Sequence, residues 1–456
     1  MLFYWLSFTL CITGFWISKK FGEPSFEQVF YHVQFSLTGL MQADPELVKS
    51  FLKNCLIYPV VLALFVYLYE ILLNTIRKIG LKRSVLIFKR TSYKFMRTIF
   101  GFSLFFFQKK LPIFFLIGAS IFFLSKISFW SYLQDQKRKD LFSENYVEPG
   151  QITSPQKKKN LILIYVESLE TTYSDDQIFG TDLLTELNAK TKGASSFENY
   201  RQTSGTGWTI AAMVSTQCGI PLQPSFYDAN DFGESVKYFL PRATCLGDML
   251  KRAGYKNVFM GGASLLFAGK GKFLKAHGYD ELYGKEEWEK LNQDVFDGWG
   301  LHDDLLLNNA KKRLDELEKG PTPFNLTILT VDTHHPNGFL SDFCIKRRAS
   351  NFTGIVKCTS VLLSDFIEYI YKQNYIKNTT VVILGDHLAM KNEIYEKITK
   401  DPNRTIFNKF ISSEPLKRNR EEFSHFSVLP SVLYSMGFRF KDNRLALGAS
   451  GFGELD

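Results

Sequence analysis

The hydrophobic and polar positions divide the chain near residue 130. Before that point, three apolar stretches approach the roughly 17–25 residues that a helix needs to cross a bilayer. These stretches are Leu2–Ile17, Leu56–Leu73 and Leu111–Trp130. The first could be a signal peptide, but it lacks the basic start and the small-residue cleavage site, and its Tyr and Trp residues suit a retained span. We therefore predict a three-helix transmembrane anchor over residues 1–130.

The charge of the connecting loops predicts the orientation of this anchor. Residues 74–110, between the second and third stretches, contain ten Lys or Arg residues and no Asp or Glu, whereas the preceding loop contains four of each sign. The positive-inside rule places such a basic loop in the cytoplasm. With three spans, the chain after residue 130 is then expected on the outer face of the membrane.

Beyond residue 159 the pattern changes to short buried strands that alternate with helices. A charged linker, residues 131–159, leads to the apolar run Asn160–Val166, which is typical of a buried parallel strand. Further strands are expected at Asn257–Met260, Asn325–Val331 and Thr379–Leu384, and helices at Cys245–Ala253, Asp303–Glu318 and Ser360–Gln373. This alternation predicts an α/β domain over residues 160–456 with a doubly wound, mainly parallel sheet.

Composition and charge exclude several classes of protein. With 22% charged and 45% apolar residues, the chain is neither disordered nor a coiled coil. Residues 1–130 hold 15 basic against 5 acidic residues, and the remainder holds 40 against 41, so the net charge of +9 belongs to the anchor. A nucleic-acid surface requires positive charge on the folded domain, so nucleic-acid binding is not expected.

Four cysteines fall in the predicted outer domain: Cys218, Cys245, Cys344 and Cys358. An even number in a domain outside the cytoplasm permits two disulfides, with three possible connectivities. Proximity along the chain favours Cys218–Cys245 and Cys344–Cys358, and four buried thiols are the alternative. Because the sequence has no CxxC, a zinc ribbon or a thioredoxin-like site is excluded.

Acidic residues and a histidine follow two of the predicted strands. In a doubly wound sheet, chemistry gathers at the carboxyl ends of the strands. Glu167 and Ser168 come directly after the first strand, and Asp386 and His387 follow the run that ends at Leu384. Two carboxylates and one imidazole suit a divalent cation such as zinc or manganese. Taken alone, an acid after a strand is more often a helix cap than a ligand.

A glycine-rich turn, within "RQTSGTGWTIAAMVSTQCGIPL" over residues 201–222, leads into a helical pattern that begins near Thr209. A helix N-terminus offers free N–H groups and a positive dipole end to a phosphate. A threonine at a helix N-terminus is usually only a cap, but a threonine hydroxyl beside a divalent cation there can act as a nucleophile. Thr209 is favoured because the helix begins there, and Thr206 remains the alternative.

Five segments in this order resemble one family. They are "NLILIYVESLE", "RQTSGTGWTIAAMVSTQCGIPL", "FAGKGKFLKAHGYDE", "DTHHPNG" and "LGDH". Together they resemble the phosphoglycerol transferases of the alkaline phosphatase/sulfatase superfamily, in particular the membrane-bound enzymes that decorate periplasmic glucans. The resemblance to lipoteichoic acid synthases is more distant. The resemblance to the phosphoglycerol transferases covers most of residues 159–456 and implies a sheet of the sulfatase/alkaline phosphatase type.

The resemblance implies roles for the matching residues. The metal ligands would be Glu167, Thr209, Asp386 and His387, with Thr209 as the nucleophile.

The substrate phosphate would be bound by His334, with His335 as the alternative. Lys270 stands where the synthases carry an arginine that binds glycerophosphate, so the charge is kept but the bidentate fork is lost. Three further residues lie in similar segments without an implied role: Trp299, Asp303 and His425, the last equally consistent with a structural surface histidine.

The resemblance implies transfer of phosphoglycerol from phosphatidylglycerol to a hydroxyl of an extracytoplasmic glycan. The reaction would pass through a phospho-threonine, release diacylglycerol and use one divalent cation, manganese or zinc. The chain would lie in a bacterial cytoplasmic membrane with its catalytic domain outside. The sulfatase motif C/S-x-P-x-R is absent, and the six histidines beyond the anchor favour one metal over the two of alkaline phosphatases.

Two other functions are weighed against this one. A phosphoethanolamine transferase acting on lipid A has the same core, but its nucleophile segment usually carries a Thr-Ser-Thr run that "GTGWTIAAM" lacks. A catalytically dead glycan-binding or sensor protein would have lost a metal ligand, and all four candidate ligands are present. Periplasmic glucan, capsule, lipopolysaccharide core and a teichoic-type polymer all present an acceptor hydroxyl.

Overall fold

The computed structural model describes residues 1–34, 44–84, 110–137, 141–150, 152–223, 238–296 and 299–454. The chain forms two compact units. One comprises Met1–Phe26 with Pro45–Lys137, and the other comprises Glu27–Asp44 with Arg138–Asp456. The expected domain boundaries at residues 130 and 159 stay a prediction, and Glu27–Asp44 groups with the second unit although it lies in the sequence expected to form the anchor.

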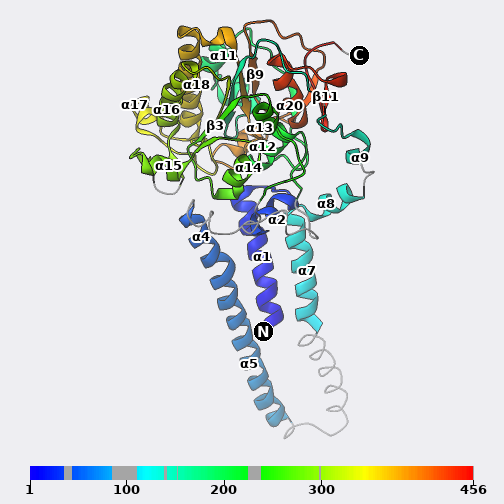
Figure 1. Cartoon of the computed structure of the whole chain (residues 1–456). Helices are drawn as coiled ribbons and strands as arrows, with labels where there is room; N and C mark the ends of the chain where they lie inside the picture. Colours follow the sequence, from blue (N-terminus) through cyan, green and yellow to red (C-terminus); the bar gives the residue numbers. More distant parts are fainter. Residues whose placement is uncertain are drawn as a thin grey trace. The chain divides into compact units, whose positions relative to one another are not determined.

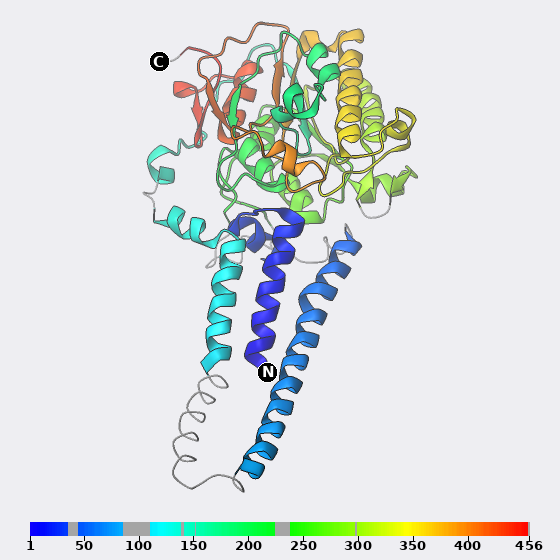
Figure 2. The ribbon, with the colours of Figure 1, turned by 180° about the vertical axis from the view of Figure 1, so that it is seen from behind.

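The first unit is helical. It contains α1 (Leu2–Phe21), α4 (Pro45–Phe51), the π-helical turn η1 (Leu52–Ile57), α5 (Tyr58–Ser84), α7 (Leu111–Lys126) and α8 (Phe129–Gln136). Within this unit α1 lies between α5 and α7 (Figures 1 and 2). Phe15 of α1 packs on Phe122 of α7 with ring centroids 4.8 Å apart, and a Cβ added at Gly14 would lie 3.3 Å from the same ring. Aromatic packing around a small residue therefore joins α1 to α7.

One continuous helical stretch in the described residues is long and apolar enough to cross a membrane. It runs over Pro45–Leu72 with a mean hydropathy of 2.2, and only 17% of its most apolar window is buried. α7 and α8 meet the same criterion only if taken together, and they are bent by 71° at their break. α1, which holds the predicted span Leu2–Ile17, does not meet it. The three-helix anchor therefore stays a prediction.

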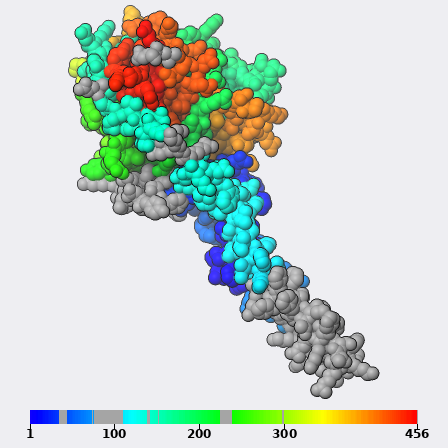
Figure 3. Space-filling view, turned by 90° about the vertical axis from the view of Figure 1, so that its right-hand side faces the viewer, coloured from blue at the N-terminus to red at the C-terminus, as the bar shows by residue number. Residues whose placement is uncertain are grey.

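Two segments expected to be irregular contain helix. The basic loop was expected from residue 74, but α5 continues through Ser84, because Lys and Arg are good helix formers. Residues 85–109 of that loop lie outside the described part of the chain. The expected linker, residues 131–159, holds the end of α8 and α9 (Leu141–Asn145). Its Val147 pairs with Ala446, so part of the linker lies against the C-terminal residues on the surface (Figure 3).

The second unit is built on a six-stranded sheet in the order β4-β3-β7-β1-β8-β9. The strands are β1 (Asn160–Val166), β3 (Lys256–Gly261), β4 (Glu281–Tyr283), β7 (Phe324–Leu329), β8 (Thr379–Gly385) and β9 (Asn408–Ile411). All neighbours are parallel except β8 and β9. The four predicted strands are the four central ones, so the mainly parallel sheet is confirmed. The short edge strands β4 and β9 were not predicted.

Helices cover both faces of this sheet (Figure 1). The two hydrophobic cores contain α12 (Thr209–Cys218), α13 (Leu246–Arg252) and α20 (His425–Ser435) on one side, and α11 (Thr185–Lys190), α16 (Asp303–Glu318) and α18 (Phe352–Lys372) on the other. Leu161 and Leu163 of β1 belong to the first core, and Ile162 and Ile164 belong to the second. The run of apolar residues in β1 follows from this burial on both faces.

The remaining elements are short. They are α2 (Phe26–Gln34), η3 (Thr171–Ser174), α10 (Asp176–Phe179), β2 (Asn199–Arg201), η4 (Phe267–Gly269), α14 (Lys270–Ala276), α15 (Lys285–Lys290), β5 (Val295–Phe296), β6 (Gly300–Leu301), α17 (Asp342–Lys346), η5 (Tyr375–Asn378), α19 (Tyr395–Ile398), β10 (Glu422–Ser424), η6 (Lys441–Asn443), β11 (Arg444–Leu445) and β12 (Gly448–Ala449). Most lie in the connections between the strands and the covering helices.

Both expected disulfides are present. Cys218–Cys245 joins the end of α12 to the start of α13, and Cys344–Cys358 joins α17 to α18. This confirms the pairing by proximity and rules out four buried thiols. Each bridge ties together helices on one face of the sheet.

Candidate active site

Buried acidic residues and a histidine meet at the carboxyl edge of two neighbouring strands. Glu167 follows β1, and Asp386 and His387 follow β8. One potential ligand atom from each lies within 4.8 Å of the others. Nε2 of His387 is 3.6 Å from Oε1 of Glu167 and 3.4 Å from Oδ2 of Asp386. The strands bring these residues together because Val166 and Gly385 are in register.

Gly385 lets the end of β8 approach the loop that follows β1. A Cβ at this position would lie 1.8 Å from the carbonyl oxygen of Leu169, which no side chain tolerates. Its N–H donates to the carbonyl of Phe407 at 2.8 Å. The glycine that precedes the Asp–His pair is therefore required by packing of the backbone.

Asp386 and His387 direct Oδ2 and Nε2 toward each other inside the cluster, 3.4 Å apart. Oδ1 of Asp386 accepts from the N–H groups of Ser168 at 2.7 Å and His387 at 2.9 Å, but the buried Oδ2 has no hydrogen bond. Nδ1 of His387 donates to the carbonyl of Leu388 at 2.9 Å, so the lone pair of the neutral ring is on Nε2. A carboxylate oxygen and an imidazole nitrogen placed in this way fit a divalent cation.

The electrostatics of this cluster favour added positive charge. Burial and the neighbouring carboxylate of Glu167 raise the pKa of Asp386 to about 7. Burial lowers the pKa of His387, but the carboxylates of Asp386 and Glu167 raise it by more. Two buried carboxylates repel each other unless a cation or a proton lies between them. The residues present therefore fit a metal ion in both geometry and charge.

Glu167 is held on both sides of its peptide unit by the loop after β7. Its N–H donates to the hydroxyl of Thr330 at 3.0 Å, and its carbonyl accepts from the hydroxyl of Thr333 at 2.6 Å. Its carboxylate accepts from the hydroxyl of Ser168 at 2.7 Å. Neither threonine was predicted from the sequence, because a threonine after a strand has no distinctive pattern.

The two candidate nucleophiles lie in different surroundings. Thr209 begins α12, is half-buried and donates its hydroxyl to Oε2 of Glu167 at 3.3 Å. Thr206 is fully buried, and its hydroxyl donates to the carbonyl of Thr203 at 2.7 Å and accepts from its N–H at 3.1 Å. Thr206 therefore closes the turn that precedes the helix, whereas Thr209 reaches the acidic cluster. This geometry favours Thr209.

His334 and His335 follow β7 and are half-buried. Nδ1 of His334 donates to the carbonyl of His335 at 2.7 Å, and its ring lies 4.0 Å from that of Trp299. Burial lowers the pKa of His334 to about 3, and burial also lowers the pKa of His335. A phosphoryl anion beside His334 would raise its pKa toward the protonated form. Trp299, which had no role from sequence, packs on this histidine and orients it.

Lys270 supplies a cation beside the acidic cluster. It opens α14, it is buried, and its Nζ lies 4.9 Å from the centroid of the Phe267 ring. Burial lowers the pKa of Lys270 to about 8, and the carboxylates of Glu167 and Glu286 oppose this shift. At neutral pH the side chain is therefore charged and suited to an anionic substrate.

A network of buried acids fixes the loop that carries the two histidines. The carboxylate of Asp303 accepts from the N–H groups of Val331 at 2.7 Å and Asp332 at 3.1 Å. Asp332 in turn accepts from Nδ1 of His302 at 2.7 Å. Asp303, in a segment without an implied role, thus positions the backbone before His334. No role for His302 or Asp332 was predicted from the sequence.

His425 and Gln202 hold the backbone of the metal-ligand loop. His425 is fully buried rather than on the surface, and its Nε2 donates to the carbonyl of Asp386 at 2.7 Å. Burial lowers the pKa of His425 to about 4, so its ring is neutral. Oε1 of Gln202 accepts from the N–H of Leu388 at 2.8 Å. Both residues act on the site through the main chain.

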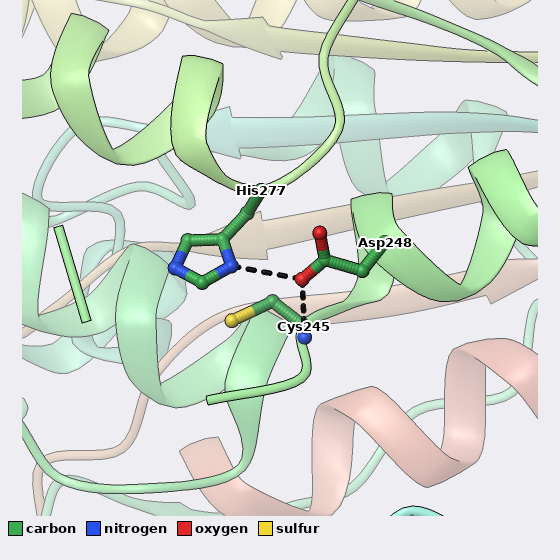
Figure 4. A group of neighbouring side chains, drawn as sticks. All are labelled: Cys245, Asp248 and His277. Carbon is green, nitrogen blue, oxygen red and sulfur yellow. Dashed lines mark hydrogen bonds and ion pairs between the residues drawn. The ribbon is translucent and has the colours of Figure 1, made fainter. Parts of the chain in front are cut away.

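A second group with metal-ligand chemistry has a structural role. Cys245, Asp248 and His277 place potential ligand atoms within 4.8 Å of one another (Figure 4). The Cys245 sulfur is bonded to Cys218 and is not available to a metal. Asp248 accepts from the N–H of Cys245 at 2.9 Å and from Nδ1 of His277 at 2.8 Å. This group therefore caps α13.

Comparison with known proteins agrees with this fold. The sulfatase family model matches residues 159–438. Phosphoglycerol transferase I of Escherichia coli is 40% identical over 324 residues, which cover 68% of this chain and 41% of the relative. The chain thus spans less than half the length of the curated relatives it matches.

Two solved structures share the fold. The lipoteichoic acid synthase LtaP from Listeria monocytogenes aligns with a TM-score of 0.51 and 20% identity, covering 64% of this chain and 75% of that one. The integral membrane protein lipooligosaccharide phosphoethanolamine transferase A (EptA) from Neisseria meningitidis aligns with a TM-score of 0.52 and 14% identity, covering 95% and 83%. At these identities the likeness concerns the fold alone. With the family match, the ordered motifs and the sheet in agreement, the chain belongs to the sulfatase family.

Proposed function

We propose that this chain is a membrane-bound, metal-dependent phosphoglycerol transferase. It transfers phosphoglycerol from phosphatidylglycerol to a hydroxyl of an extracytoplasmic glycan and releases diacylglycerol. The observation that carries this proposal is the Thr209 hydroxyl, 3.3 Å from Glu167 at the buried cluster of Asp386 and His387. The 40% identity to phosphoglycerol transferase I supports the choice of transferred group.

Glu167, Thr209, Asp386 and His387 would hold one divalent cation, manganese or zinc. When bound, the cation would lower the pKa of the Thr209 hydroxyl and offset charge on the phosphoryl oxygens. Glu167 orients the hydroxyl, and the N-terminus of α12 places its free N–H groups and positive dipole end beside the phosphate.

Transfer proceeds in two displacements at phosphorus. The Thr209 oxygen loses its proton and attacks phosphatidylglycerol, the bond from phosphorus to the diacylglycerol oxygen breaks, and diacylglycerol leaves with a proton. An acceptor hydroxyl then loses its proton, attacks the glycerophosphoryl group and returns Thr209 to its hydroxyl form. Lys270 stabilises the phosphoryl oxygens in both steps, and His334 does so once the phosphoryl anion has raised the pKa of its ring and protonated it, since phosphoryl transfer depends on positioning and charge.

We further propose that residues 1–130 anchor the enzyme in a bacterial cytoplasmic membrane, with the catalytic domain outside the cytoplasm. The two disulfides support an oxidising compartment. The absence of acids between residues 74 and 110 supports a cytoplasmic location for that segment. This orientation places the site on the side of the membrane where both the outer-leaflet lipid and an envelope glycan are available.

The test is release of labelled diacylglycerol by the full chain in membranes that contain phosphatidylglycerol labelled in an acyl chain. Manganese or zinc and a mixture of envelope glycans are added, and a parallel sample contains labelled phosphatidylethanolamine. We expect release from phosphatidylglycerol only. Release from phosphatidylethanolamine instead would favour a phosphoethanolamine transferase, and no release from either lipid would contradict the proposal.

The charge of Lys270 predicts how donor binding depends on pH. We expect the KM for phosphatidylglycerol to rise as the pH increases through about 8, where this lysine loses its proton. Lys270→Arg should move the rise to higher pH because a guanidinium stays protonated, and Lys270→Ala should raise KM by about tenfold or more at neutral pH. Lys275→Ala, on the exposed part of the same helix, is the control. A profile of Lys270→Arg that equals the wild type would rule out Lys270 as the titrating group.

A further inference from the structure

Helix α2 (Phe26–Gln34) brings a distant part of the sequence to the site. It lies in the region from which only membrane spans and their loops were expected. However, Glu27–Asp44 belongs to the same compact unit as the catalytic sheet. The helix therefore packs with the catalytic unit.

Tyr31 fixes α2 to two segments that carry site residues. It is fully buried, and its hydroxyl donates to the carbonyl of Ala268 at 2.8 Å. Its ring lies 5.9 Å from that of Trp208. Ala268 is two residues before Lys270, and Trp208 directly precedes Thr209. Tyr31 thus contacts the segments that hold the lysine and the nucleophile.

The same helix contacts the segment that follows the metal ligands. The side-chain amide of Gln28 donates to the sulfur of Met390 at 3.6 Å, and Met390 is three residues after His387. On the opposite side of the helix, Val33 is 71% exposed. α2 therefore has one face against the site and one face directed away from it.

His32 presents a hydrogen-bond acceptor on the side of α2 that faces the site. Its Nδ1 donates to the carbonyl of Gln28 at 2.8 Å, so the lone pair of the neutral ring is on Nε2. Its ring lies 6.0 Å from that of Phe267, the same ring that lies beneath the Lys270 ammonium. Burial lowers the pKa of His32, the bond to Gln28 opposes this, and the Lys270 charge lowers it further, so the ring is neutral at pH 7.

We propose that His32 determines specificity for the lipid donor by accepting a hydrogen bond at Nε2 from a hydroxyl of the glycerol headgroup whose phosphate lies at Lys270. The inference rests on the proposed function. A hydroxyl donates to a neutral imidazole without added charge. An ethanolamine headgroup would instead bring an ammonium ion close to the Lys270 ammonium, where like charges in a buried site repel strongly. This region of α2 and α14 therefore selects glycerol over ethanolamine.

The test measures binding of glycerol 1-phosphate and of inorganic phosphate to the full chain in detergent. Calorimetry is carried out with manganese on the Thr209→Ala background, so that no turnover occurs. His32→Ala should weaken glycerol 1-phosphate by about tenfold and leave inorganic phosphate unchanged, because only the first ligand carries a hydroxyl donor. His32→Gln, which keeps an acceptor oxygen, should recover part of the loss. Val33→Ala on the exposed face is the control and should bind both ligands like the parent protein.

The KM and kcat for phosphatidylglycerol supply a second readout on the active enzyme. His32→Ala should raise the KM for phosphatidylglycerol more than it lowers kcat. Equal weakening of both phosphate ligands, or loss in His32→Gln as large as in His32→Ala, would overturn the role of His32. If the wild type releases no diacylglycerol, the proposed function fails, and the two calorimetric comparisons still decide whether His32 binds the hydroxyl.

Discussion

Replacing Thr209 by Ala is expected to abolish diacylglycerol release, with a loss of at least about 1,000-fold in rate. Of the two candidate threonines, Thr209 is the one whose hydroxyl contacts Glu167. It lies at the N-terminus of α12, where the helix has free N–H groups. Rates are measured on membranes that contain labelled phosphatidylglycerol. Thr209→Ser, which keeps a hydroxyl in the same place, should retain part of the activity.

Thr206→Ala is the matched control in the same turn. Its hydroxyl is hydrogen-bonded to the Thr203 backbone, so its removal should loosen the turn and reduce activity only in part.

The covalent intermediate supplies a direct test. When the wild-type enzyme reacts without an acceptor and is quenched with acid, the peptide that contains Thr209 should carry the added mass of a glycerophosphoryl group. An inactive Thr206→Ala beside a fully active Thr209→Ala would assign the nucleophile to Thr206.

Replacing Asp386 by Asn is expected to weaken manganese and zinc binding by more than about 100-fold and to stop the reaction. The Asp386 Oδ2 is buried and has no hydrogen bond in the protein, so this oxygen is available to coordinate a cation. The same change should raise the Tm of the cation-free protein by a few degrees in mildly alkaline buffer, because it removes one of two facing buried carboxylates. Loss of a structural ion pair would instead lower the Tm. A higher Tm of Asp386→Asn without the cation, together with a smaller gain from manganese, therefore identifies a metal-binding site.

The pH dependence of this second effect follows from the raised pKa of Asp386. The folded protein holds the Asp386 proton more tightly than the unfolded chain, in which the pKa is about 4. The resulting contribution to the free energy of unfolding is present at low pH and is lost as the pH rises through about 7. The gain in Tm from Asp386→Asn should therefore shrink as the pH is lowered.

Thermal unfolding with and without manganese measures both effects, since a ligand that binds the folded state raises its Tm. Asp342→Asn, at an exposed acid in the first turn of α17, is the control and should respond to manganese like the wild type. If Asp386→Asn gains as much Tm from manganese as the wild type, the cation does not bind at this cluster.

The central strands were predictable because burial on both faces of the sheet requires a run of apolar residues, which can be recognised in the sequence. β1 and β8 are covered on both faces, so nearly every residue must be apolar, and a run such as Asn160–Val166 has few other uses in a soluble domain. β9 is a short antiparallel edge strand that includes the half-buried Lys409. An edge strand of this kind has no pattern that separates it from a loop, and only its pairing with β8 identifies it.

The identity of the site residues was predictable to the extent that they lie directly after strands. Glu167 and Asp386 could be named from the sequence because parallel strands end at one edge of the sheet. The choice between Thr206 and Thr209 could not be made firmly, because the two lie in the same turn and differ only in which oxygen each hydroxyl contacts.

The sequence by itself predicted the α/β class of the catalytic domain, the family and the order of the site motifs, and it favoured the two disulfide pairs, because each of these signals is carried by residues close together in the chain. Only the tertiary structure decided which groups support the site from a distance. His425 reaches the Asp386 carbonyl from α20, and α2 brings Tyr31 and His32 to the segment of Lys270. These contacts join residues far apart in sequence, and a nine-residue amphipathic helix has the same local pattern on a membrane surface as on a protein. The physical reason is that local patterns encode burial, whereas the partner in a long-range contact is decided by how the whole chain packs.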